Sequence, residues 1–338
     1  MWASLLLVPA TILADALHAG KSTLFILGAL SLIPLAWLIG ESTEHAAAHT
    51  GARIGGFLNA TFGNAPELII AVIAVADGLF DVVRGSLAGS VVSNILLVLG
   101  AAVLLGEDAD LDRRSLLGQL GLVVAAVLLL LIPSIPGWSG DPNRDSLALL
   151  GIGPAVVMLV LYLVVTTRGL RGGTPSEGEL REHAWSLRSA IAILAGATAA
   201  TAVISEIFVR SIEAFADAAG LSEFFIAIVI VAIVGNAAEH GGAIVIARRG
   251  KMRLATEIAI SSSAQVGVLL IPAIALISFA FPDPLTLSFR PVEVGAMAGA
   301  AAFVAFVIHD GRSRRWEGAL LLGIYSLMAV GFFAAGDR

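Results

Sequence analysis

The stretch Gly63-Asn64-Ala65-Pro66-Glu67 places a carboxylate inside a long run of apolar residues. The pattern returns 172 residues later as Gly235-Asn236-Ala237-Ala238-Glu239, again within an apolar segment. Ionisable side chains are costly inside a bilayer, and where they occur they mark ion pathways. Two carboxylates in matching positions therefore predict a cation site shared by two related halves of the chain.

The composition is that of a membrane protein. Apolar residues make up 58% of the 338 residues, and Asp, Glu, Lys and Arg only 14%, whereas soluble domains carry about 25% charged residues. The mean hydropathy is +0.93, and apolar runs long enough to span a bilayer recur along the chain. The absence of cysteine excludes disulfides, zinc–thiolate sites and cysteine nucleophiles. We therefore expect an all-α integral membrane protein.

The apolar pattern predicts about eleven transmembrane helices. An extra N-terminal helix occupies residues 1–20, and two five-helix repeats follow over 21–168 and 187–338. The polar segment 169–186, which contains Gly172, Gly173 and Pro175, joins them as a cytoplasmic linker. The predicted spans cover 2–17, 22–40, 54–76, 82–105, 116–132, 147–166, 187–208, 224–247, 254–279, 292–308 and 316–334, and the polar tail of the second span continues as helix to Thr50.

The distribution of basic residues predicts the orientation. If the first span begins in the cytoplasm, most of the 20 Lys and Arg residues fall in cytoplasmic loops, as the positive-inside rule requires. The N-terminus is then cytoplasmic and the C-terminus outside. Five spans separate equivalent positions of the two repeats, and this odd number makes the repeats inverted.

The similarity between the repeats extends over a helical hairpin. Gly78 corresponds to Gly250 at the same offset, and one deletion then aligns Ser90 with Ser261 and Asn94 with Gln265. The tips of the hairpins carry opposite charges, as expected if they lie on opposite faces of the membrane. The tip of the first hairpin carries Asp77, Asp81 and Arg84, and the tip of the second carries Arg248, Arg249, Lys251 and Arg253.

The residue types of the motif predict a broken helix that exposes oxygen ligands. Pro66 has no N–H to donate, so the carbonyl of Phe62 loses its helical partner. Broken helices are tolerated at membrane depth where they line a cavity. Ala238 replaces the proline in the second copy, so a break there depends on Gly235 alone. We expect the Phe62 carbonyl to be available more readily than its counterpart at Val234.

If the two copies meet across a pseudo-two-fold axis, every donor is an oxygen atom. Such ligands suit Ca²⁺, and Mn²⁺ is also compatible. Two neighbouring carboxylates in a low dielectric cannot both stay ionised without a cation, so the pair holds a divalent cation or protons, which gives antiport. The predicted cation- and proton-binding residues are Glu67, Glu239, Asn64, Asn236, Gly63, Gly235, Phe62, Ser90, Asn94, Ser261 and Gln265, with Glu67 and Glu239 as the metal ligands.

Residues 56–67, 85–94 and 235–240 resemble the cation/proton exchanger (CAX) family of the Ca²⁺:cation antiporter superfamily. The resemblance implies Ca²⁺/H⁺ antiport with Glu67 and Glu239 as shared ligands, and sliding of the second and seventh helices. Sodium-coupled relatives carry Thr- and Ser-rich motifs where this chain has Asn-Ala-Pro and Asn-Ala-Ala. Many relatives also have an acidic helix between the halves. The linker here is short and of mixed charge, so no regulatory role is carried over to it.

Other polar residues near the spans have two interpretations each. The resemblance implies that His240 takes part in proton coupling, and the alternative is a packing histidine bonded to a neighbouring carbonyl. An access path for cations is predicted at Glu41, Glu44, His45 and Glu206, and the alternative is a set of solvated helix ends. We interpret Asp108, Asp110 and Asp112 as a solvated loop.

The sequence therefore predicts a Ca²⁺/H⁺ antiporter in the inner (plasma) membrane of a prokaryote, with Ca²⁺ and H⁺ as substrates. We expect no cofactor, no nucleic-acid partner and no enzymatic activity, because the chain offers no cysteine and no convincing His-x-x-x-His or Ser–His arrangement at membrane depth. A Na⁺- or K⁺-coupled exchanger, a monovalent cation/proton antiporter and a cation channel remain as alternatives, and the oligomeric state is left open.

Overall fold

The structure is a computed structural model that describes residues 2–172 and 185–337, with backbone alone for 51–57, 59, 60 and 169–172. Most of the predicted linker 169–186 lies outside the described residues. Described residues are helical almost throughout, and among them one short antiparallel pair of strands occurs, β1 (Ala109–Asp110) and β2 (Arg312–Ser313). The chain divides into two compact units, each described by itself.

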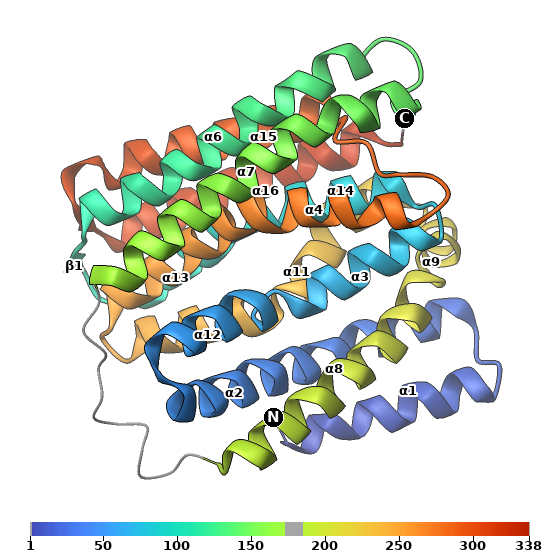
Figure 1. The fold of residues 1–338 in the computed structure, drawn as a ribbon, viewed down its shortest axis with the longest axis horizontal. Coiled ribbons are helices and arrows are strands. Elements are labelled where there is room, and N and C mark those ends of the chain that lie inside the picture. The colour runs from blue at the N-terminus through green and yellow to red at the C-terminus, as the bar shows by residue number, and fades with distance from the viewer. Residues whose placement is uncertain (1, 173–184, 338) are drawn as a thin grey trace. The chain divides into compact units, whose positions relative to one another are not determined.

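The first unit comprises Met1–Ile73, Tyr162–Ala219 and Val234–Ala238. Figure 1 shows α1, α2 and α8 running side by side in this unit. Phe25 stacks on Phe208 and Phe215, and the hydroxyls of Thr11 and Ser31 join α1 to α2 at 2.8 Å. Its elements are η1 (Trp2–Leu6), α1 (Leu7–Ala16), α2 (Lys21–Phe62), most of α3 (Ala65–Ala76), α8 (Leu187–Val209) and α9 (Ile212–Ala219).

The second unit comprises Ala74–Leu161, Gly220–Ile233 and Glu239–Arg338. Its centre is α4, which is buried from Val82 to Ser93. α6 lies beside α13 and α15, and α16 lies beside α5; Figure 1 shows α6 next to α15. Its elements are α4 (Phe80–Ser93), η2 (Asn94–Val98), α5 (Leu99–Leu105), α6 (Arg113–Gly137), most of α7 (Asp145–Gly172), α10 (Glu223–Phe225), η3 (Ile226–Val231), most of α12 (Ala237–Arg248), α13 (Met252–Gln265), η4 (Val266–Leu270), α14 (Ile271–Ile277), η5 (Ser278–Ala280), α15 (Pro291–Val307), η6 (Ile308–Asp310) and α16 (Arg315–Ala335). The short α11 (Ala232–Gly235) passes from this unit to the first.

Among the described residues, eight helices are long and apolar enough to cross a membrane, or nine if the bent pair Ile212–Ala219 and Glu223–Gly235 forms one span. The apolar helices Trp2–Ala16 and Ala65–Ala76 are shorter. They correspond to the predicted first span and to part of the third, so the count of eleven stays a prediction. The helical continuation of the second span to Thr50 is confirmed, because α2 is unbroken from Lys21 to Phe62.

An extended segment between η5 and α15 is buried in the second unit. Arg84, which is fully buried, donates from Nη1 to the carbonyl and hydroxyl oxygens of Thr286, at 3.2 and 3.0 Å, and from Nη2 to Asp81 at 2.6 Å. Ser134 donates to the Leu287 carbonyl and accepts from the Phe289 N–H. These side chains supply hydrogen bonds that a non-helical backbone needs when it is buried in a membrane protein.

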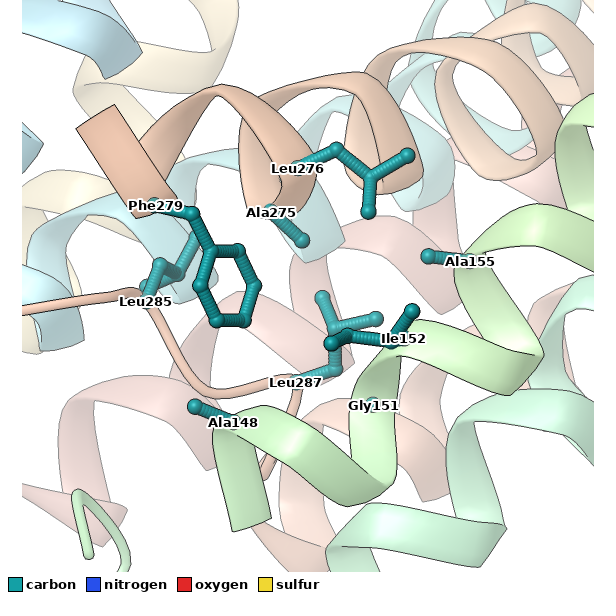
Figure 2. A pocket seen from close by; sticks show the side chains of 9 residues that line it. All are labelled: Ala148, Gly151, Ile152, Ala155, Ala275, Leu276, Phe279, Leu285 and Leu287. Carbon is teal, nitrogen blue, oxygen red and sulfur yellow. The ribbon is translucent and has the colours of Figure 1, made fainter. Parts of the chain in front are cut away.

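A small pocket lies where α7 and α14 meet this extended segment. Figure 2 shows its lining, in which Phe279, Leu276 and Leu287 face α7 across the opening. All the lining side chains are apolar, and none carries an oxygen that could coordinate a cation. The lining of this pocket therefore offers no side-chain ligand for a cation. The lining residues are Ala148, Gly151, Ile152, Ala155, Ala275, Leu276, Phe279, Leu285 and Leu287.

The acidic loop before α6 is held by backbone N–H groups and by Arg253 rather than being only solvated. Asp112 caps α6 by accepting from the Ser115 N–H at 3.2 Å, and it pairs with Arg253. Asp108 accepts from the Arg315 N–H at 3.2 Å. The bond from Ser115, supported by Arg253, holds the pKa of the Asp112 carboxyl below its usual 3.8.

We expect Asp112→Ala to lower the thermal stability of the purified protein at neutral pH. A carboxyl whose pKa is lowered on folding stabilises the fold above its unfolded pKa, and loses that effect as the pH falls through the folded pKa. The difference in melting temperature between wild type and variant should therefore shrink as the pH falls below 3.8. Tryptophan fluorescence of the protein in detergent would measure the two melting temperatures. Asp110→Ala is the control, because the Asp110 side chain is 92% exposed, and an equal loss in both variants would contradict the capping role.

Candidate cation site

The first motif lies at a break between two helices of the first unit. α2 ends at Phe62, Gly63 and Asn64 form a turn, and α3 begins at Ala65. Pro66 occupies the first turn of α3, where an N–H has no intrahelical acceptor, so its ring is tolerated there. The Asn64 carbonyl accepts from the Leu68 N–H at 3.0 Å. The predicted helix break is therefore present, and it places Glu67 in the first turn of α3.

The second motif is also broken, although it has no proline. α11 ends at Gly235, Asn236 forms the turn, and α12 begins at Ala237. An ideal Cβ built on Gly235 would lie 3.0 Å from Cγ of Glu67. The glycine of the second motif thus leaves room for the carboxylate side chain of the first. A side chain at position 235 would displace Glu67, which explains the need for glycine better than backbone freedom does.

The first unit gathers the predicted ligands Glu67, Asn64 and Asn236. Their exposed fractions are 7%, 2% and 1%, so all three are buried. Phe62 and Gly63 are half-buried beside them in the chain. This group contains one carboxylate, two amides and the backbone of the turn, which are the oxygen donors that a hard divalent cation prefers.

The second unit holds the other carboxylate and its partners. Glu239 forms a side-chain hydrogen bond with Ser262, and its Oε2 atom is buried without a hydrogen-bond partner among the described residues. Nε2 of His240 lies 3.1 Å from Oδ1 of Asn94, and both residues are buried. Because an amide oxygen can only accept, Nε2 carries the proton in this bond. Asn94 is therefore oriented by His240, a contact that the sequence did not indicate.

Helix bounds correct the register of the repeat. The pairs α3 and α12, α4 and α13, η2 and η4, and α5 and α14 all begin and end 172 residues apart, with no deletion. Ser90 therefore corresponds to Ser262, and Asn94 to Val266. The predicted pairings of Ser90 with Ser261 and of Asn94 with Gln265 are wrong. The deletion pairs the amide residues Asn94 and Gln265, whereas the gapless offset that relates Gly78 to Gly250 relates Ser90 to Ser262.

The predicted ligands Ser261 and Gln265 have less prominent positions than Ser262. The Ser261 hydroxyl donates to the Ile258 carbonyl of its own helix at 3.1 Å. Ser261 and Gln265 are both half-buried. Ser90, by contrast, is 2% exposed on α4. In both repeats the helix changes to π geometry directly after this region, at Asn94 and at Val266. Such segments occur frequently at functional sites.

The predicted access residues all lie in the first unit, and Glu41, His45 and Glu206 have structural contacts. His45 stacks on Trp185 with ring centroids 4.2 Å apart, and its Nε2 lies 3.4 Å from Glu41. Glu44 is exposed on the same helix. Glu206 pairs with Arg210 at 2.7 Å, near the end of α8. The role of these four residues in cation access stays a prediction.

An all-α bundle with two broken helices and a carboxylate at each break defines the class of secondary transporters. More specifically, the chain belongs to the sodium/calcium exchanger protein family, whose model matches residues 21–168 and 189–334. It is 37% identical over 339 residues to the Ca²⁺/H⁺ antiporter ChaA of Bacillus subtilis, covering 96% of each chain. It is 31% identical over 353 residues to a Ca²⁺/H⁺ antiporter of Aphanothece halophytica, covering 97% of this chain and 95% of that one.

Solved structures show the same fold. The structure of native YfkE matches with a TM-score of 0.83 and 34% identity, covering 97% of each chain. The crystal structure of the H⁺/Ca²⁺ exchanger CAX matches with a TM-score of 0.74, and at 18% identity it supports the fold alone. The predicted resemblance to cation/proton exchangers is confirmed, and so is the all-α membrane fold.

Proposed function

We propose that this chain exchanges Ca²⁺ for H⁺ across a membrane by alternating access. The observation that carries the proposal is the duplicated break with a carboxylate in the first turn after it, Glu67 on α3 and Glu239 on α12. Relatives that match over nearly their whole length are named Ca²⁺/H⁺ antiporters. Their similarity to this chain supports the same pair of substrates.

The chemistry of the two carboxylates supports coupling. A carboxylate at membrane depth has to be neutralised, by a cation or by a proton. Glu67 with Asn64 and Asn236, and Glu239 with Ser262, offer oxygen donors that suit Ca²⁺. We propose that these residues, together with Ser90 and Asn94, bind Ca²⁺ or protons in turn. That both carboxylates hold the same ion remains a prediction from the sequence repeat.

We also propose that the two matched ranges are inverted repeats, with the N-terminus in the cytoplasm of a prokaryote. The family model matches twice, and four pairs of helical elements share one offset. The excess of Lys and Arg in alternate loops supports the orientation. Similarity to antiporters of Bacillus subtilis and Synechocystis supports a prokaryotic plasma membrane as the proposed location.

Transport by inside-out vesicles tests the proposed function. Vesicles that contain the overproduced chain and carry a proton gradient, acid inside, should accumulate radioactive calcium, and a protonophore should abolish the uptake. Replacing Na⁺ and K⁺ by choline should leave the uptake unchanged. A requirement for Na⁺ or K⁺ would instead support the cation-coupled exchangers, and flux that is independent of the proton gradient would support a channel. Competition by Mn²⁺ would measure the selectivity.

A further inference from the structure

Helices α4 and α13 are joined by a hydrogen bond between two equivalent positions of the repeat. The Ser263 hydroxyl donates to the Val91 carbonyl at 3.0 Å. Both residues are buried, with exposed fractions of 0% and 1%, and they are 172 residues apart, which is the repeat offset. A residue that touches its own equivalent lies on a two-fold axis, as in an isologous interface. The crossing of α4 and α13 therefore marks the pseudo-two-fold axis within the second unit.

This bond exists in one direction only. The symmetric counterpart would need a hydroxyl at position 91 donating to the carbonyl of residue 263, and Val91 has none. A backbone carbonyl has two lone pairs, so the Val91 oxygen can accept from Ser263 in addition to any helical donor. The contact is buried, and a buried hydrogen bond fixes the approach of two helices more firmly than apolar contact alone.

The residues beside this contact are the candidate ligands. Ser262, which bonds Glu239, precedes Ser263, and Ser90 precedes Val91. Adjacent residues on a helix point about 100° apart, so Ser263 can hold the crossing while Ser262 faces Glu239. Ser90 and Ser262 are equivalents at the repeat offset, and each lies one residue before the crossing of α4 and α13. Their separation therefore depends on how closely α4 and α13 approach at this point.

We propose that Ser263 is a positioning residue, which sets the spacing of Ser90 and Ser262 by tying α13 to the backbone of α4. The role rests on the proposed function, because it concerns ligands of the transported cation. Ser263 is not itself expected to bind the ion. Its hydroxyl acts by donating to the Val91 carbonyl. The tie between α4 and α13 requires one hydroxyl at the crossing, and either helix can supply it.

The first test is a pair of variants measured in the vesicle assay. Ser263→Ala should raise the KM for Ca²⁺ about tenfold, the effect of losing one buried hydrogen bond that holds the ligands in place. The maximal rate should change much less. Exchanging the two side chains, Val91→Ser with Ser263→Val, keeps the volume at the crossing and returns a hydroxyl from the other side, so the KM should recover to near the wild-type value. Ser326→Ala, which removes a hydroxyl bonded within α16, is the control.

Two results would overturn the proposal. One is an unchanged KM in Ser263→Ala, and the other is an exchanged variant that is as impaired as Ser263→Ala. A merely structural role would show as equal loss of maximal rate and of folded protein in both variants. Recovery in the exchanged variant would separate positioning from general packing, because that variant has the same composition as the wild type.

A spectroscopic measurement keeps the test independent of transport. The chain contains no cysteine, so spin labels can be placed on Asp77→Cys and Lys251→Cys, at the exposed ends of the two hairpins in the second unit. The distance distribution should broaden in Ser263→Ala and narrow again in the exchanged variant. An unchanged distribution in Ser263→Ala would refute the positioning role even if the wild type transported other ions. If the wild type showed no Ca²⁺/H⁺ exchange while the distance distribution broadened in Ser263→Ala, only the proposed function would be refuted.

Discussion

Replacing Glu67 or Glu239 by glutamine is expected to reduce Ca²⁺-coupled proton exchange by at least about a hundredfold, the cost of losing one buried charged ligand. Glutamine has nearly the shape of glutamate, so the packing of Glu67 against Gly235 and the bond from Ser262 to position 239 can be kept. What disappears is the negative charge and the ability to take up a proton. Each variant should therefore fold and yet fail in both half-reactions of the exchange.

The measurement is calcium uptake by inside-out vesicles under an imposed proton gradient, normalised to the amount of folded protein. Glu213→Gln is the matched control, because Glu213 is an exposed residue of α9. Uptake in either site variant at more than a tenth of the control rate would contradict the assignment of that carboxylate. A binding measurement with radioactive calcium in detergent would show whether the loss lies in cation affinity or in the return of the proton.

The second large effect is expected for Gly89→Ala, which should destabilise the second unit by about 3 kcal/mol through overpacking. α4 and η3 approach so closely at this point that a Cβ on Gly89 would overlap the carbonyl oxygen of Ile228. It would also lie 2.7 Å from the Ile228 carbonyl carbon and 2.8 Å from Cβ of Ala232. Backbone atoms cannot rotate away as a flexible side chain can, so the two helices have to separate.

Thermal aggregation of the purified variant would measure this effect, as the temperature at which half of the monodisperse protein is lost. Gly121→Ala on α6 is the control, because a Cβ there meets nothing within 4 Å. Alanine favours a helix over glycine by about 1 kcal/mol, so the control should be unchanged or slightly more stable. If Gly89→Ala and Gly121→Ala had the same aggregation temperature, α4 and η3 would not be packed this closely. Transport by Gly89→Ala should also fall, since η3 leads through α11 to Asn236.

Much of the site could be predicted because its signals are local. Pro66 and the glycines indicated breaks in apolar helices, and both breaks are present. The buried positions of Asn64, Glu67 and Asn236 agree with their prediction as polar residues within apolar segments. Ser262 was missed, because a one-residue shift of the repeat gave a better match of amide residues. On a helix such a shift turns a side chain by about 100°, so a small error in register exchanges one serine for its neighbour.

Contacts between distant segments could not be predicted in the same way. The burial of Arg84 against Thr286 and the contact of His240 with Asn94 join residues more than a hundred positions apart. Their sequence neighbourhoods contain no pattern that specifies the partner. A polar residue in an apolar segment indicates that a partner is required, but which partner it finds depends on how the helices pack.

The sequence by itself determined the class of protein, the two carboxylates, the helix breaks beside them and the family, because hydropathy, helix-breaking residues and repeated motifs are properties of short segments. The tertiary structure alone decided the register of the repeat, the place of Ser262 beside Glu239 and the close approach at Gly89. It also decided the bond from Ser263 to Val91. These depend on which faces of two helices meet, and that is set by the packing of whole elements rather than by any residue and its neighbours in the chain.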